Sequence, residues 1–199
     1  MLTYLLSYAN TTPPLEYNDT SKILRAGHFI EVLEDPDHKL TIQDIIHLDT
    51  FKNYNQDVPR FGVSRSTYWG KFTIDNQTEL KEFILELNKV DIDEFVLYYK
   101  EKADDYKFVA RNLTATSKKY SGRLYTLDFC VPPGEQRTLY LKLRTKWNVT
   151  FPVQIASRDR MQHRHFNHEL LSGIYFGILL IMVLYNTFIY FSVKDRSYF

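Results

Sequence analysis

The stretch that decides the fold is YWGKFTI, residues 68–74. Its side chains alternate, so that one face is apolar and the other is polar or amphipathic. In order, the faces hold Tyr68, Phe72 and Ile74, with Gly70 between them, against Trp69, Lys71 and Thr73. A period of two is typical of a half-buried antiparallel strand. YWGKFTI therefore predicts a strand with one face in a core.

Five further stretches repeat this alternation. They are FILEL (83–87), EFVLYYK (94–100), LYTLDFCV (124–131), TLYLKLR (138–144) and FPVQIA (151–156). Turn signals separate the stretches: DNQT (75–78), KKYSGR (118–123) and VPPGEQ (131–136). Many short strands without a helical period predict an all-β domain, a jelly-roll-like antiparallel β-sandwich over residues 27–157. Before the strands, LTIQDIIHL (40–48) predicts a short helix capped by Thr41 and Asp44, and residues 51–65 read as a loop.

A different segment follows the strands. Residues 170–193 contain no Asp, Glu, Lys, Arg or His, and as a helix they span roughly 36 Å at about 1.5 Å per residue. A bilayer core is about 30 Å thick. We therefore expect one transmembrane helix at 170–193, a juxtamembrane linker at 158–169 and the start of a cytoplasmic segment at 194–199.

Composition narrows the class of protein. The net charge is +1, which does not favour a nucleic-acid binder, because such proteins carry a clustered basic face. The single cysteine, Cys130, excludes an internal disulfide and is interpreted as an inert buried thiol. Residues 1–26 read as a signal-peptide remnant, ending in Ser7-x-Ala9, and a polar lead-in.

Catalytic and metal-binding motifs are weak, so we predict no enzyme, no catalytic residue, no metal site and no cofactor. The acidic run at 91–94 is interpreted as a turn entering a strand. Glu86 and Asp128 are the only plausible carboxylate pair for a glycoside hydrolase. The clustered His163, His165 and His168 lack further ligands at zinc-like spacing.

The alternation instead predicts a ligand-binding patch on the non-core face of the sheet. We assign it to Trp69, Lys71, Tyr98, Tyr140 and Arg144. Trp69 is expected to offer a flat apolar platform, and the two cations to bind acidic or hydroxyl groups. Two alternatives stay open: the face is an ordinary solvated surface, or residues 51–65 cover Trp69.

Several quoted segments, in this order, carry a resemblance to a known family. They are HFIEVLEDPDHKLTIQDI (28–45), FGVSRSTYWGKFTIDNQT (61–78), VDIDEFVLYYK (90–100), RTLYLKLRTKWNVTFPVQI (137–155) and GIYFGILLIMVLYNTFIYFSVKDRSYF (173–199). Over residues 27–199 the chain resembles bacterial seven-transmembrane receptors with diverse intracellular signalling modules, specifically their type-two extracellular sensory domain and first membrane helix. It departs at YWGK, where the family carries a larger apolar residue and Arg. Lys71 keeps the charge but not the planar two-pronged donor.

The resemblance implies a function and a location. The N-terminal domain is expected outside the cytoplasm of a bacterium, in a protein of the inner membrane, where it senses a carbohydrate or other small polar ligand. Its further partners would be the lipid bilayer, six more helices and a cytoplasmic signalling module, without nucleic acid. The alternative is a membrane-anchored carbohydrate-binding or adhesion module that does not signal.

Overall fold

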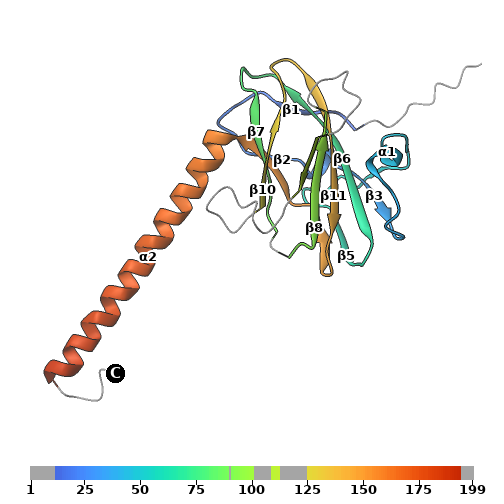
Figure 1. Cartoon of the computed structure of the whole chain (residues 1–199). Helices are drawn as coiled ribbons and strands as arrows, with labels where there is room; N and C mark the ends of the chain where they lie inside the picture. Colours follow the sequence, from blue (N-terminus) through green and yellow to red (C-terminus); the bar gives the residue numbers. More distant parts are fainter. Residues whose placement is uncertain (1–11, 90, 101–108, 113–124, 194–199) are drawn as a thin grey trace, which may run out of the picture. The chain divides into compact units, whose positions relative to one another are not determined.

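The computed structural model describes residues 12–89, 91–100, 109–112 and 125–193 (Figure 1). The chain divides into two compact units, residues 1–160 and 161–199. The predicted signal-peptide remnant, the turn at 118–123 and the segment after residue 193 lie outside the described residues.

The described residues of the first unit form three sheets. The largest has the order β4-β3-β6-β11-β8-β9, and β1 pairs in parallel with β6. Its strands are β1 (Leu15–Tyr17), β3 (Glu31–Asp35), β4 (Lys52–Asn53), β6 (Thr67–Asn76), β8 (Glu94–Tyr99), β9 (Val109–Asn112) and β11 (Gln136–Arg144). The second sheet has the order β10-β7-β13-β2, formed by β2 (Leu24–Arg25), β7 (Glu82–Leu87), β10 (Tyr125–Cys130) and β13 (Val153–Ser157). The third pairs β5 (Arg60–Val63) with β12 (Asn148–Thr150).

The core lies between the first two sheets, and the strand alternation explains it. From β6 the core receives Tyr68, Phe72 and Ile74, and from β7 it receives Phe83, Leu85 and Leu87. The residue at position 70, in the apolar face of β6, is a glycine. A Cβ there would lie only 3.1 Å from the Phe151 ring, so this ring occupies the space that a side chain would need. These features confirm the predicted all-β, jelly-roll-like antiparallel sandwich. All six predicted strands are present.

Three segments differ from the sequence prediction. The lead-in forms β1 and β2, and the expected loop at 51–65 contains β4 and β5. The predicted helix at 40–48 shortens to α1 (Ile42–Ile45). Its cap is as expected, because the Asp44 carboxylate accepts the Thr41 backbone N–H at 2.8 Å and its hydroxyl at 2.6 Å. A single 3-10 turn, η1, spans Gly27–Phe29.

A long helix, α2 (Arg158–Val193), follows the strands. The predicted linker at 158–169 is part of this helix. Within the described ranges, α2 is the one helix long and apolar enough to cross a membrane, with a mean hydropathy of 2.0 over its most apolar window. The Thr187 hydroxyl donates to the Val183 carbonyl at 2.8 Å. That bond satisfies a polar group inside the helix, as a bilayer requires.

Candidate functional site

The five predicted site residues lie on one face of the largest sheet, the face turned away from the core. We call this the polar face. One cross-strand row runs Glu31, Lys71, Tyr140, Tyr98 over β3, β6, β11 and β8. The next row runs Leu33, Trp69, Lys142, Val96 over the same strands. Arg144 follows on β11, opposite Glu94. Side chains directly opposite one another on a face have Cβ atoms about 4.5–5.5 Å apart, so the rows bring the predicted residues together.

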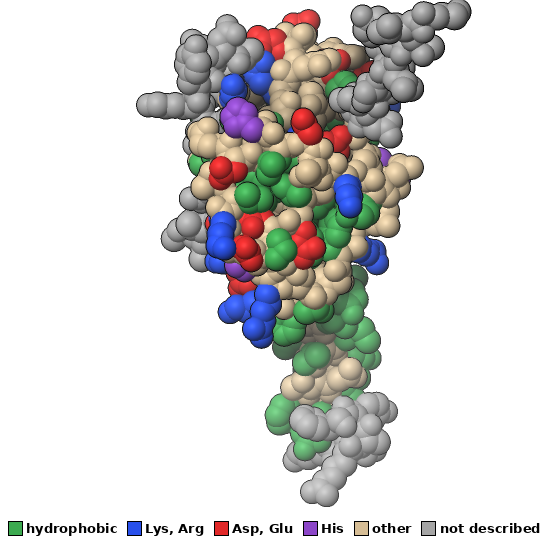
Figure 2. All heavy atoms as spheres, turned by 90° about the vertical axis from the view of Figure 1, so that its right-hand side faces the viewer, with side chains coloured by type: hydrophobic (Ala, Val, Ile, Leu, Met, Phe, Trp, Pro, Cys, Tyr) green, Lys and Arg blue, Asp and Glu red, His purple; other side chains and the backbone are tan. Residues whose placement is uncertain are grey.

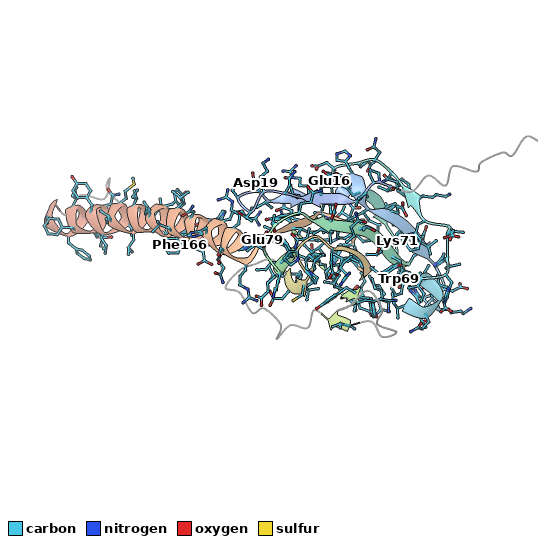
Figure 3. The ribbon with its side chains drawn as sticks, turned by 90° about the horizontal axis from the view of Figure 1, so that it is seen from above. Glu16, Asp19, Trp69, Lys71, Glu79 and Phe166 are labelled. Atoms are coloured by element: carbon cyan, nitrogen blue, oxygen red, sulfur yellow. The ribbon has the colours of Figure 1, made fainter. Side chains whose placement is uncertain are left out.

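Trp69 does not offer an open platform. Its side chain is 1% exposed, and its ring stacks on Tyr98 with centroids 5.8 Å apart and planes 28° apart. The sequence identifies the face of a residue, but its exposure depends on what distant segments place over that face. Figure 3 shows Trp69 and Lys71 at the end of the domain that holds α1. Trp69 is therefore a buried residue of the polar face, and its ring packs against that of Tyr98.

Among the residues that the structure describes, the buried indole N–H of Trp69 has no hydrogen-bond partner. A buried donor left unpaired costs roughly 1–3 kcal/mol. The site residue with the most buried ring thus carries an unmet hydrogen bond, a feature that the sequence does not reveal.

The cations of the polar face already have carboxylate partners. Lys71 lies 3.5 Å from Glu31, while Lys142 and Arg144 lie 2.8 Å and 3.6 Å from Glu94. Figure 2 likewise shows basic and acidic side chains interspersed over the face of the molecule that it presents. Lys71 has Glu31 to itself, whereas Lys142 and Arg144 share Glu94, so three cations of the polar face are paired with two carboxylates.

Aromatic rings approach two of these cations. The Lys71 ammonium lies 5.2 Å from the centre of the Phe51 ring, and the Lys142 ammonium lies 6.0 Å from that of Trp69. Phe51 belongs to the segment 51–65, so this segment reaches Lys71 on the polar face; the alternative that it covers Trp69 stays a prediction. Such cation–ring pairs hold flexible ammonium groups in place.

The two tyrosines are half-buried, and burial sets their titration. Burial raises the pKa of both Tyr98 and Tyr140, and Lys142 partly offsets the rise at Tyr98. Both phenols therefore stay protonated at neutral pH. A neutral phenol can donate and accept a hydrogen bond, which suits it to ligand hydroxyls.

The structure also places the residues considered for catalysis and for metal binding. Glu86 is fully buried, and Asp128 lies 3.4 Å from Arg158. The three histidines lie on α2. Across the part of the chain that the structure describes, no three His, Cys, Asp or Glu side chains are grouped to hold a metal ion. Cys130 is exposed, which corrects the expected burial of this thiol.

Sequence reasoning passed over Trp147, whose side chain is 66% exposed. It follows β11, and its backbone N–H donates to the Thr145 hydroxyl at 3.2 Å, which in turn donates to the Asp91 carbonyl at 2.7 Å. The signal available in the sequence was its position three residues after Arg144, outside the alternating run. This turn presents an aromatic ring from a fixed backbone.

Comparisons with known proteins now identify the family. The family model described as 7TMR-DISM extracellular 2 matches residues 27–157. The chain belongs to this family. The model described as 7TM diverse intracellular signalling matches residues 168–199. The 7TMR-DISM domain is thus the extracellular sensory domain of a membrane signalling receptor, placed outside the cytoplasm and followed by a membrane helix of an inner-membrane protein. No curated protein matches the chain.

Solved structures give distant likenesses to the 7TMR-DISM chain. The carbohydrate-binding protein TmCBM61, in complex with beta-1,4-galactotriose, has 7% identity and a TM-score of 0.35, over 67% of this chain and 92% of its own. The bacteriophage CBA120 tailspike protein 4 has 12% identity and a TM-score of 0.31, over 64% and 18%. The K1 adhesin domain of Lys-gingipain from Porphyromonas gingivalis has 10% identity and a TM-score of 0.30, over 71% and 96%. At these scores the likenesses carry no argument about a ligand.

Proposed function

We propose that the sensory domain binds a small, uncharged, hydroxyl-rich ligand, with carbohydrate as the favoured class, and that it does so without catalysis. The binding surface is the polar face, centred on the row Lys71, Tyr140, Tyr98. The observation that carries the proposal is this row, in which a cation and two neutral phenols stand side by side on adjacent strands.

The ion pairs of the polar face support an uncharged ligand over an anion. Lys71 pairs with Glu31, while Lys142 and Arg144 share Glu94, so an incoming carboxylate would compete with a glutamate that is already in place. Hydroxyl groups can instead add to such pairs, since glutamate oxygens accept and the cations donate. A sugar therefore fits the face at lower cost than an acidic metabolite.

The rigidity of the face also supports binding. Tyr98 stacks on the buried Trp69, and Lys142 pairs with Glu94. Groups held in place before binding lose less conformational entropy when the ligand arrives. The carboxylates of Glu31 and Glu94 are paired with cations, which favours a role in binding over acid–base catalysis.

The experiment is a binding screen on the chain held in phospholipid nanodiscs. A glycan array and a thermal-shift screen with neutral sugars and small polar metabolites are run in parallel. The proposal predicts at least one neutral sugar that binds and raises the melting temperature. Ligands that are all anionic would overturn the assigned class, and silence in both screens would favour sensing of a protein.

A matched pair of variants locates the site. Tyr140→Phe removes one phenol hydroxyl from the central row, whereas Tyr54→Phe removes one from an exposed tyrosine outside that row. The proposal predicts weaker sugar binding in the first variant only. Equal binding by both variants would place the site elsewhere.

A further inference from the structure

The segment before the family match, residues 15–25, touches both sheets. Its strand β1 pairs with β6, with Tyr17 opposite Asn76, and its strand β2 pairs with β13, with Leu24 opposite Ile155. We call residues 15–25 the strap. Because β6 also carries Trp69 and Lys71, the strap connects the strand at the centre of the polar face to the strand that leads into α2.

Tyr17 attaches the strap to β7 and to the end of β13. Its side chain is fully buried, and its ring meets Phe83 edge-on with centroids 5.0 Å apart. Its hydroxyl accepts the backbone N–H of Ser157 at 3.0 Å and donates to the Lys22 carbonyl at 3.2 Å. One phenol thus joins residues that lie 140 positions apart in the sequence.

Ser157 is the last residue of β13 and directly precedes α2. Its hydroxyl donates to the Thr20 carbonyl at 3.2 Å and accepts the backbone N–H of Arg160 at 3.3 Å. The second bond caps the start of the helix. Ser157 therefore bonds the strap with both its backbone and its side chain while it caps the helix.

Arg158, the first residue of α2, forms ion pairs with the second sheet. It lies 3.4 Å from both Glu82 on β7 and Asp128 on β10. Both pairs are partly exposed, and such pairs contribute little each. The buried bond between the Ser157 N–H and the Tyr17 hydroxyl, with the part-buried bonds of the Ser157 hydroxyl, restrains the start of the helix as well.

We propose that the strap is a transmission element, which couples movement of β6 to the start of the membrane helix. A shift of β6 carries β1 with it through their pairing. The Tyr17 hydroxyl and the Thr20 carbonyl, which are hydrogen-bonded to the N–H and the hydroxyl of Ser157, then move as well. Ser157 is displaced with them, and so is the cap that it forms on the helix. The strap itself, residues 15–25, lies before the matched range 27–157, and its role does not depend on the identity of the ligand.

Hydrogen exchange on the chain in phospholipid nanodiscs tests the inference. Tyr17→Phe removes the hydroxyl that holds Ser157, and Tyr99→Phe removes a hydroxyl from another fully buried tyrosine, which lies on β8 and away from the strap. The expected result in Tyr17→Phe is exchange about five- to tenfold faster at Ser157 and Arg160, as for one lost hydrogen bond. Tyr99→Phe is expected to leave these two amides unchanged. Unchanged Ser157 and Arg160 in Tyr17→Phe would overturn the proposal.

A second variant changes the same contact from the Ser157 side. Ser157→Ala removes the bond to Thr20 and the cap on Arg160. A transmission element predicts faster exchange on the strap, at Leu24 and Arg25, as well as at Arg160. Acceleration confined to Arg160 would show a helix cap without coupling and would contradict the inference. In both variants Leu141, in the core, reports whether the domain remains folded.

Discussion

Replacement of Trp69 by alanine removes the largest fully buried side chain of the domain. Truncating a buried Phe or Trp to alanine costs about 3–5 kcal/mol of unfolding free energy. At about 2–4 °C per kcal/mol for a domain of this size, the melting temperature should fall by about 6–20 °C. The change is measured as the thermal loss of β-sheet circular dichroism by the chain in nanodiscs.

Two further variants make this prediction sharp. Trp147→Ala is the matched control, because the other tryptophan is 66% exposed and surface substitutions usually stay within about 0.5 kcal/mol. Trp69→Phe keeps a ring against Tyr98 but removes the indole N–H, for which the described part of the chain offers no hydrogen-bond partner. Relief of that unpaired donor offsets part of the lost volume, so the loss should stay below about 2 kcal/mol. A melting temperature that Trp69→Ala leaves unchanged would refute the supporting role of this ring.

Three other predictions follow from single observations. Burial raises the pKa of Tyr98 and Tyr140 above the ordinary 10.0, so as the pH rises the unfolded chain loses these protons before the folded chain does. The melting temperature, measured across pH, should therefore hold below about pH 10 and fall above it. The fully buried Asn76 amide donates to two carbonyls, at 2.6 and 2.8 Å, so Asn76→Ala should cost at least about 2 kcal/mol by leaving buried acceptors unpaired; a smaller loss in urea unfolding would argue against it. The exposed Cys130 should react with a membrane-impermeant maleimide in intact spheroplasts, whereas reaction only after lysis would contradict an extracytoplasmic domain.

Local sequence patterns were enough to predict the sandwich. The alternation in β6, β8 and β11 placed one residue set in the core and the other on the polar face, because side chains of a strand point to opposite sides in turn. It also brought Lys71, Tyr140 and Tyr98 to one face before any pairing was known. The long apolar run likewise predicted the helix, since its composition alone distinguishes a membrane span.

The missed features depend on contacts between distant segments. β1 has three residues and pairs in parallel with β6, so no local alternation could reveal it. The burial of Trp69 and the glutamate partners of the cations depend on β3 and β8, which are far from β6 and β11 in sequence. Only the fold shows that Tyr17, in an apparent lead-in, bonds to Ser157.

The central claim is that the polar face is the ligand-binding surface of the sensory domain. The most direct test is calorimetric titration of a neutral sugar found in the screen against three forms of the chain: wild type, Tyr140→Phe with Arg144→Gln, and Trp147→Ala. The account predicts a dissociation constant at least about tenfold higher in the double variant, since lost hydrogen bonds to neutral and charged groups add roughly 1.4 kcal/mol or more, and an unchanged constant in Trp147→Ala. A constant unchanged in the double variant but raised in Trp147→Ala would contradict the claim and move the site to the turn after β11.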